Sequence, residues 1–270
     1  MPADHTERNP ALEPIEEQGQ GGPVEHFVDE GLITGVVRIV KTGKEASVHL
    51  CRANPSTTGE RLLALKVYHP LDRRDFRDES LYRDGEWIKE RRIRVALEKR
   101  TRYGREVQGA IWVNREWETL RELAEAGAPV PRPVAATPDA ILMTYIGDRL
   151  MAAPQLRAYR PAPDEAEELF RQVVRAIEQM LYRNVIHGDL SAYNVLVWEE
   201  RVVVIDLPQA VDPRKNRHAR RLLERDVARI CEHFARFGVR SSPDRIADDL
   251  WTGWQFADLV PEELRAELDL

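Results

Sequence analysis

The sequence predicts an α+β protein of two lobes, in which an antiparallel-sheet lobe precedes a mainly α-helical lobe. Short apolar runs separated by turn residues fill the first half of the 270-residue chain, a pattern typical of strands. A long apolar stripe of helical period opens the second half. A polar loop and two short apolar runs then follow, which predict a hairpin within the helical lobe. The length suffices for one two-lobed unit.

The composition is that of an ordinary soluble globular protein, with 43% hydrophobic and 32% charged residues. A formal net charge of −6 argues against a protein that coats nucleic acid in general. Two cysteines, Cys51 and Cys231, are too few for a disulfide framework, and no Cys/His spacing resembles a zinc site. Because the sequence shows neither a signal peptide nor a membrane-length apolar run, we expect a cytoplasmic protein with no membrane partner.

The first lobe is predicted over residues 24–146, after a disordered tail at 1–23 that is rich in Glu, Pro, Gly and Gln. Residues 34–53 form a strand, a turn and a strand, with Thr42-Gly43-Lys44-Glu45 at the turn. Backbone amides in such a turn can approach phosphates, and Lys44 and Ser47 add polar reach, although an ordinary hairpin is an alternative. A Walker loop is excluded because Glu45 stands where Ser or Thr must hold Mg²⁺.

The run 62–68 is an apolar strand that contains one lysine, Lys66. A buried ammonium requires an anionic partner, whereas an edge strand would leave Lys66 in solvent. A charged, flexible insertion follows at 72–106, which is either a solvated face or a docking surface. Residues 113–126 then predict an amphipathic helix in which Glu116 borders the buried face and can reach Lys66, with an ordinary surface glutamate as the alternative.

The second lobe is predicted over 147–240. It follows a strand at 140–147 and opens with a helix capped by Asp164-x-x-Glu167. A basic cluster at 214–221 is interpreted as a solvated helix start, with an acidic or phosphate-bearing partner as the alternative. Residues 241–270 form a C-terminal extension with three short helical signals.

The strongest chemical signal is the spacing His187-x-Asp189-x-x-x-x-Asn194, followed by an apolar strand that ends in Asp206. This is the spacing of the protein-kinase catalytic loop, in which the first Asp accepts the proton of the attacking hydroxyl. The Asn and the later Asp hold the Mg²⁺ that bridges the ATP phosphates. The alternative is a β-hairpin with polar residues at its tip.

Six segments together resemble the RIO-type atypical serine/threonine protein kinases, most closely the type-1 subgroup in a bacterial member. These are 42–46, 65–68, 114–120, 143–147, 187–194 and 205–209, in the order in which they occur in the family. The resemblance spans about residues 31–238 and implies a bilobal protein-kinase-like fold with one regulatory-type helix in the first lobe.

The resemblance also implies a role for each matching residue, with ATP and Mg²⁺, or alternatively Mn²⁺, as cofactors. Asp189 is the expected base, Asn194 and Asp206 are the expected metal ligands, and Asp206 and Lys66 complete the catalytic set. The expected nucleotide-binding residues are Thr42, Gly43, Lys44, Ser47, Lys66, Glu116, Met143, Thr144 and Ile146. The last three belong to the expected hinge between the lobes, where backbone groups hydrogen-bond adenine and Met143 lies at the back of the pocket; a plain core strand is the alternative.

Two departures affect this expectation. Lys41 stands where the family usually has Ser, and Ser47 where it often has Asn. Ser191, two residues after Asp189, is as in RIO-type kinases, whereas ordinary serine/threonine kinases have Lys there. The predicted activity is therefore transfer of the ATP γ-phosphate to Ser or Thr of an unknown protein substrate, with autophosphorylation.

Two alternatives stay open. One is an ATP-hydrolysing switch that grips a ribonucleoprotein or protein partner, with a transient phosphate on Asp206. The other is a small-molecule phosphotransferase of aminoglycoside-kinase type, which shares the His-Gly-Asp loop. The sequence gives no oligomeric state.

Overall fold

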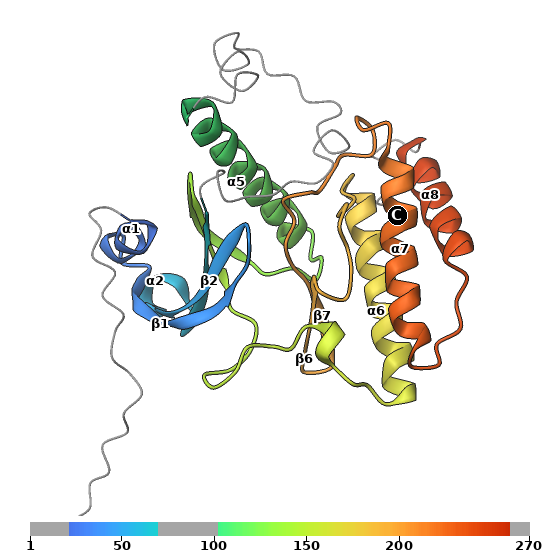
Figure 1. The fold of residues 1–270 in the computed structure, drawn as a ribbon, viewed down its shortest axis with the longest axis horizontal. Helices are drawn as coiled ribbons and strands as arrows, with labels where there is room; N and C mark the ends of the chain where they lie inside the picture. Colours follow the sequence, from blue (N-terminus) through green and yellow to red (C-terminus); the bar gives the residue numbers. More distant parts are fainter. Residues whose placement is uncertain (1–21, 70–101, 260–270) are drawn as a thin grey trace, which may run out of the picture.

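The computed structural model describes residues 22–69 and 102–259, with side chains described for 22–69 and 109–257. Predictions for the tail at 1–21, for most of the charged insertion and for residues 260–270 lie outside these ranges. The two lobes are visible in Figure 1, with the sheet and α5 on one side and the long helices on the other. No helix in the described ranges is long and apolar enough to cross a bilayer.

The first lobe is built on a five-stranded antiparallel sheet of order β1-β2-β3-β5-β4. Its elements are α1 (Pro23–Asp29), β1 (Ile33–Thr42), β2 (Ala46–Ala53), α2 (Pro55–Thr58), β3 (Leu62–Tyr68), α5 (Arg102–Glu125), β4 (Pro133–Thr137) and β5 (Ala140–Thr144). The two predicted strands at 34–53 and the strand at 62–68 are confirmed. β4 had no counterpart in the prediction.

Alternation along the strands gives the sheet two different faces. One face packs Leu63, Leu65 and Leu142 against Phe27 of α1 in a small separate core. The other face carries Lys66 and Ile141 and turns toward α5. Because Lys66 and Ile141 are paired across β3 and β5, the lysine is fixed in the middle of the sheet rather than at an edge.

α5 begins at Arg102, whereas the sequence predicted a helix from 113 and a flexible insertion through 106. The boundary was wrong because Arg, Glu and Gln are good helix formers that need no apolar stripe. Val113, Leu120 and Leu123 are nevertheless buried in the main core, as the predicted stripe requires.

The second lobe contains η2 (Leu156–Ala158), α6 (Pro163–Tyr182), the hairpin β6 (Val195–Trp198) and β7 (Arg201–Val204), then α7 (Ala219–Ala235) and α8 (Pro243–Leu259). The predicted capping box at Asp164 was wrong. Ala162 is the N-cap, and its backbone N–H donates to Glu165 Oε2 at 3.2 Å. The described part of the C-terminal extension is one helix rather than several short ones.

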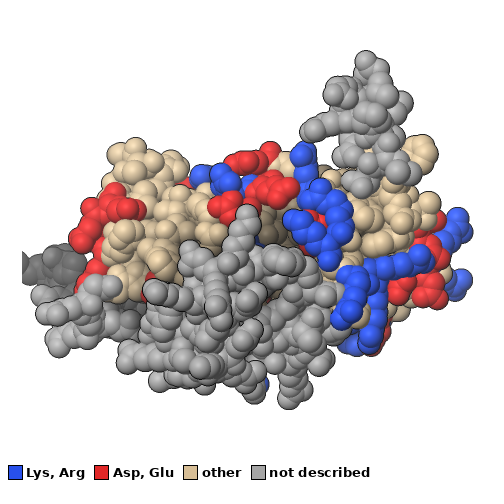
Figure 2. All heavy atoms as spheres, turned by 90° about the horizontal axis from the view of Figure 1, so that it is seen from above, with Lys and Arg blue, Asp and Glu red and all other residues tan. Residues whose placement is uncertain are grey.

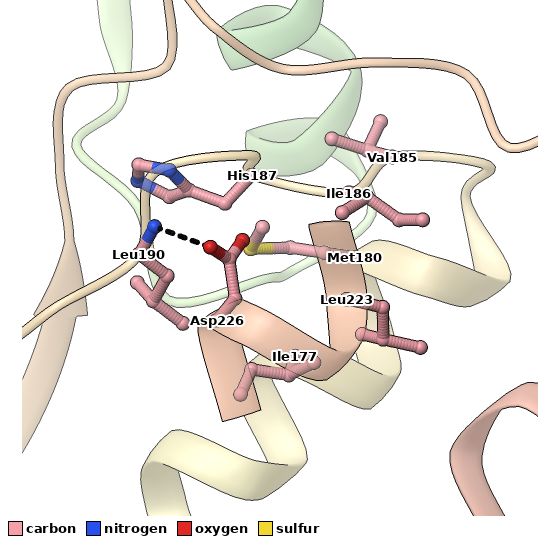
Figure 3. A pocket seen from close by; sticks show the side chains of 8 residues that line it. All are labelled: Ile177, Met180, Val185, Ile186, His187, Leu190, Leu223 and Asp226. Atoms are coloured by element: carbon pink, nitrogen blue, oxygen red, sulfur yellow. Dashed lines mark hydrogen bonds between the residues drawn. The ribbon is translucent and has the colours of Figure 1, made fainter. Parts of the chain in front are cut away.

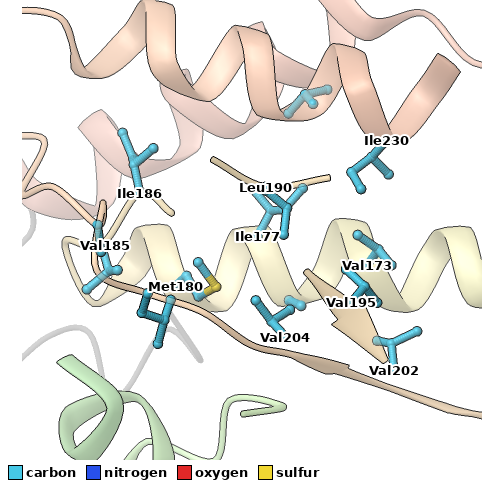
Figure 4. Close-up of a cluster of buried hydrophobic side chains, with 14 of the residues drawn as sticks. Val173, Ile177, Met180, Val185, Ile186, Leu190, Val195, Val202, Val204 and Ile230 are labelled. Carbon is cyan, nitrogen blue, oxygen red and sulfur yellow. The ribbon is translucent and has the colours of Figure 1, made fainter. Parts of the chain in front are cut away.

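The core of the second lobe joins α6, α7 and the hairpin (Figure 4). Val173, Ile177 and Met180 of α6 pack with Ile230 of α7. The hairpin adds further apolar side chains from the other side, namely Val195, Val202 and Val204. This packing fixes Val195 and Val204, where the hairpin begins and ends. The loop at 187–194 before the hairpin and Asp206 after it belong to the candidate site.

Candidate active site

Lys66 lies in a row of directly paired residues across the sheet, which runs Lys41, Val48, Lys66, Ile141 and Ala136. Directly paired residues point to the same face of a sheet. The row therefore presents the Lys66 ammonium to the second lobe, and only 8% of the residue is exposed.

The Lys66 ammonium binds two carboxylates. Its Nζ lies 2.7 and 3.0 Å from the two oxygens of Glu116 and 2.6 Å from Asp206 Oδ1. Burial lowers the pKa of Lys66, but the negative charges beside it, chiefly Asp206 and Glu116, together raise it by a larger amount. Its pKa therefore lies well above the ordinary value. The lysine is therefore a permanent cation on β3 that links Glu116 of α5 with Asp206, two residues after β7.

Glu116 is a buried anion with three kinds of partner. Besides Lys66, it accepts a short hydrogen bond from the hydroxyl of Tyr68 and one of 3.3 Å from the backbone N–H of Leu207. Burial and the Glu116 charge raise the pKa of Tyr68, so its hydroxyl stays protonated as a donor. These bonds satisfy a carboxylate that is only 3% exposed.

Asp206 follows β7 with a left-handed backbone, φ +71°, which directs its side chain back toward the sheet lobe. Burial raises its pKa, but the charge and hydrogen bond of Lys66, together with smaller contributions from His187 and Lys41, lower it by more in total, so the pKa is below the ordinary value. The side chain remains 43% exposed. An ionised, partly open carboxylate is thus held beside a fixed cation.

The loop at 187–194 is tied to Asp206 through its backbone. Ile205 N–H donates to Asn194 C=O at 2.9 Å, and His187 Nε2 donates to Ile205 C=O at 3.1 Å. His187 Nδ1 in turn accepts from Asp189 N–H at 3.3 Å, which fits a neutral imidazole. Burial lowers the pKa of His187, in agreement with that tautomer.

Asn194 and Asp206 are oxygen donors of the kind that Mg²⁺ prefers. The Asn194 side-chain amide donates to Asp189 C=O at 3.0 Å, which turns its own oxygen the other way. Asp206 uses Oδ1 for Lys66 and retains Oδ2. No group of three or more His, Cys, Asp or Glu in the described ranges suits a metal ion. A magnesium ion held mainly by phosphates needs only one or two protein carboxylates, so the donor set fits.

Helix α7 holds the backbone of the loop from below (Figure 3). The carboxylate of Asp226 accepts from Gly188 N–H at 2.8 Å and from Leu190 N–H at 3.1 Å. Arg225 donates a short hydrogen bond to Gly188 C=O. The same region contains a small apolar cavity between α6 and α7, lined on one side by Ile177, Met180 and Leu223. Its other lining residues include His187 and Leu190 of the loop, and most of the lining belongs to the core of the second lobe.

Arg229, one turn further along α7, contacts the loop through a side chain. Its guanidinium lies 2.7 Å from Asp189 Oδ1, and the two side chains are 39% and 44% exposed. The sequence-predicted base is therefore ion-paired to a residue that sequence reasoning did not select.

The predicted phosphate turn has mixed placement. Gly43 N–H donates to Ala46 C=O at 2.9 Å, which closes the hairpin around Lys44. Thr42 and Ser47 are paired with each other in the next row of the sheet, so their side chains lie on the face opposite Lys66. Ser47 Oγ is 2.8 Å from His69 Nε2. Nucleotide contacts by Thr42 and Ser47 stay predictions. Their backbone groups are placed to make such contacts, whereas their side chains are not.

The predicted hinge residues also divide between the two faces. Met143 is paired with Ala64 and shares the face of Lys66. Thr144 lies on the opposite face, where its hydroxyl accepts from Arg132 N–H at 2.9 Å. Ile146 C=O accepts from Ala153 N–H at 3.0 Å. Adenine contacts by these three residues stay predictions.

Four residues of the site were missed: Lys41, Tyr68, Asp226 and Arg229. Tyr68 was detectable in principle, because period-two alternation along the same strand places it on the face of Lys66. Lys41 required the register between β1, β2 and β3 as well. Asp226 gave a weaker signal, as a lone carboxylate on the apolar side of a helix. Arg229 gave none, because its contact crosses 40 residues of sequence.

The basic cluster lies at the N-terminal end of α7, on the side of the molecule seen in Figure 2, where Lys and Arg gather over the helical lobe. Much of its charge is paired within the chain. Arg214 and Lys215 bind Asp212, and Arg220 binds Glu224 and Asp248. These ion pairs support the interpretation as a solvated helix start.

Comparison with known families gives a match to the RIO domain over residues 50–246. The RIO-type serine/threonine-protein kinase Rio1 of Thermoplasma acidophilum is 33% identical over 138 residues, 51% of this chain and 71% of that protein. The serine/threonine-protein kinase RIO1 of Chaetomium thermophilum is 29% identical over 231 residues, which cover 82% of this chain but 43% of that protein. This chain therefore spans less than half of that longer relative.

Among solved structures, the fold is similar to that of the Rio2 kinase from Chaetomium thermophilum in complex with ADP, Mg²⁺ and phosphoaspartate. The TM-score is 0.63 at 22% identity, covering 84% of this chain and 63% of that one. A second structure of the same kinase gives a TM-score of 0.64. Both confirm the predicted bilobal architecture.

Proposed function

This chain belongs to the RIO domain family, and from that premise we propose that it is a protein serine/threonine kinase that uses ATP and Mg²⁺. The observation that best supports the proposal is the position of Lys66, which binds Glu116 and Asp206 together across the two lobes. The loop with Asp189 and Asn194 is bonded to the residue before Asp206. Phosphoryl transfer requires such a cluster of fixed charges around one nucleophile.

Each of these residues has a separate task in the proposed reaction. Lys66 binds the α- and β-phosphates, and Glu116 keeps its ammonium in place. Asn194 and Asp206 would hold the metal ion, which supplies positive charge to the phosphates when bound. Asp189 orients the acceptor hydroxyl and takes its proton. Thr42, Gly43, Lys44 and Ser47, with Met143, Thr144 and Ile146 at the hinge, line the nucleotide; Thr42, Ser47 and Thr144 do so through backbone groups, because their side chains lie on the other face of the sheet.

The test is incubation with γ-labelled ATP and Mg²⁺, followed by mapping of the labelled residue. We expect label on Ser or Thr, stable to acid. Asp189→Asn keeps the size of the side chain but removes the base, so labelling should slow by about 100- to 10,000-fold. ADP affinity should change little, because the base acts mainly in the transition state. Asp212→Asn, which changes a carboxylate outside the site, is the matched control.

A second candidate function is an ATP-hydrolysing switch with a transient phosphate on Asp206, acting on a protein or ribonucleoprotein partner. The exposed part of the Asp206 carboxylate favours it, as does the phosphoaspartate in the complex of the related Rio2 kinase. In this case ATP is consumed without an added acceptor, and the label is lost on treatment with hydroxylamine. A label on Ser or Thr alone excludes this candidate.

A further inference from the structure

The ion pair between Arg229 and Asp189 differs in kind from the hydrogen bonds by which Asp226 and Arg225 of α7 hold the loop. Asp226 and Arg225 hold backbone groups of Gly188 and Leu190. Arg229 instead binds a side chain, and that side chain is the proposed base. Removal of Arg229 therefore leaves the backbone anchors of the loop in place.

The cations near the proposed base Asp189 show why its ion pair with Arg229 matters. The loop from His187 to Asn194 contains no Lys or Arg, and the position two residues after Asp189 is the neutral Ser191. Lys66, the cation of the opposite lobe, is bound to Glu116 and Asp206. The two carboxylates that face the reaction are thus each assigned a different cation, Lys66 for Asp206 and Arg229 for Asp189.

We propose that Arg229 is a positioning residue for Asp189, which fixes one carboxylate oxygen so that the other meets the acceptor hydroxyl. A guanidinium only donates hydrogen bonds and does not titrate in the working range, so it holds Oδ1 without competing for the proton. Charge-assisted bonds of this kind are about twice as strong as neutral ones. This inference rests on the proposed kinase function.

The step that Arg229 supports is the in-line displacement. The acceptor oxygen forms a bond to the γ-phosphorus, and the bond from that phosphorus to the bridging oxygen breaks, so that ADP leaves with the electron pair. The hydroxyl proton passes to Asp189 Oδ2, while Oδ1 stays bound to Arg229. Without the guanidinium the carboxylate rotates about its Cβ–Cγ bond, and fewer encounters have the productive geometry.

The opposite role would be a latch, in which Arg229 occupies the base and must release it before reaction. The two roles differ in sign. Arg229→Gln should lower kcat for Ser/Thr labelling by about 10- to 100-fold if Arg229 positions the base, and should raise kcat if it is a latch. The KM for ATP should stay within about twofold of the wild type, since positioning acts on the transition state.

A double-mutant cycle separates positioning from a general structural effect. A residue that acts through Asp189 has nothing left to act on in Asp189→Asn, so adding Arg229→Gln there should change the residual rate by less than about twofold. Arg236→Gln removes the same charge at the C-terminal end of α7, from an exposed pair with Glu232, and should behave as wild type. Melting temperatures of all variants establish that they are folded.

An unchanged or increased kcat in Arg229→Gln overturns the inference, and so does a further fall in the Asp189→Asn background. Both results leave the proposed function intact as long as the wild type labels Ser or Thr. A wild-type protein that labels neither overturns the proposed function and this inference together.

Discussion

Lys66 Nζ lies 2.6 Å from Asp206 Oδ1, so a strand of the sheet lobe is ion-paired to the residue that follows the hairpin of the helical lobe. The same ammonium binds Glu116 of α5. Two carboxylates that would repel each other are thereby held around one cation, at the point where the lobes meet.

Replacing this cation should weaken nucleotide binding. In Lys66→Met, phosphates would meet two uncompensated carboxylates, and a lost bond to a charged group is worth about 1.5–3 kcal/mol, or roughly 10- to 100-fold in affinity for ADP with Mg²⁺. Calorimetric titration measures the change, with Lys215→Met as the control at an exposed ion pair. An affinity equal to that of the wild type would remove Lys66 from the proposed site.

Tyr68→Phe should lower the free energy of unfolding by about 1–3 kcal/mol, because buried Glu116 loses a hydrogen-bond donor while the ring remains. Urea unfolding of the wild type and the variant measures the loss. Tyr182→Phe removes a hydroxyl from a partly buried tyrosine elsewhere in the chain and serves as the comparison. Equal stability of Tyr68→Phe and the wild type would contradict a role for this hydroxyl in satisfying Glu116.

Gly147→Ala should destabilise the segment that links the lobes. Its φ of +135° is strained for any side chain, and a Cβ would lie 2.6 Å from Met151 O and 2.8 Å from Ala153 N. Gly127→Ala is the matched control, since Gly127 also has positive φ but a Cβ there would have nothing within 4 Å. The control should cost about 1 kcal/mol from backbone strain alone, and Gly147→Ala clearly more in thermal unfolding. Similar losses in both variants would show that the backbone around Met151 can move aside.

Asp226 should make stability depend on pH. Burial raises its pKa to about 7, against the opposing effects of Arg225 and of the two loop N–H groups. Between about pH 4 and pH 7 the folded protein holds a proton that the unfolded chain has released, so the free energy of unfolding falls as pH rises through this window. The full contribution is at most roughly 4 kcal/mol.

The measurement is urea unfolding of the wild type and Asp226→Asn at several pH values. The stability difference, wild type minus variant, should decrease from pH 4 to pH 7 and level off above that. A difference that increases over the window would mean that the hydrogen bonds from Gly188 and Leu190 keep Asp226 ionised in the folded state.

Local sequence patterns predicted the elements of this fold well where burial imposes a period. The strand at Leu62–Tyr68 and the helix that contains Leu169 and Val173 show such a period and were placed correctly. The start of α5 was missed because its first turns have no apolar stripe, and β4 because the proline at its first position obscures the strand signal.

The site residues that lie close together in the sequence could be predicted from their spacing. Asp189, Asn194 and Asp206 are close in sequence. In the structure the Asn194 side-chain amide donates to Asp189 C=O, and the N–H of Ile205, next to Asp206, donates to Asn194 C=O. The cost of burying a charge predicted an anionic partner for Lys66, and the family resemblance implied that this partner is Glu116; the pair is present. The contact of Arg229 with Asp189 depends on how α7 crosses the loop, and no local rule encodes that crossing.

The grip of α7 on the loop has a consequence for motion. Asp226 and Arg225 bind Gly188 and Leu190 from adjacent positions on α7, so the loop and the helix should move together as one rigid unit. The amide protons of Gly188 and Leu190 are donated to the Asp226 carboxylate of α7, although both residues flank the proposed base Asp189. They should therefore exchange with deuterated solvent only when the helix itself unravels, and a rotation of the helix would carry the base with it.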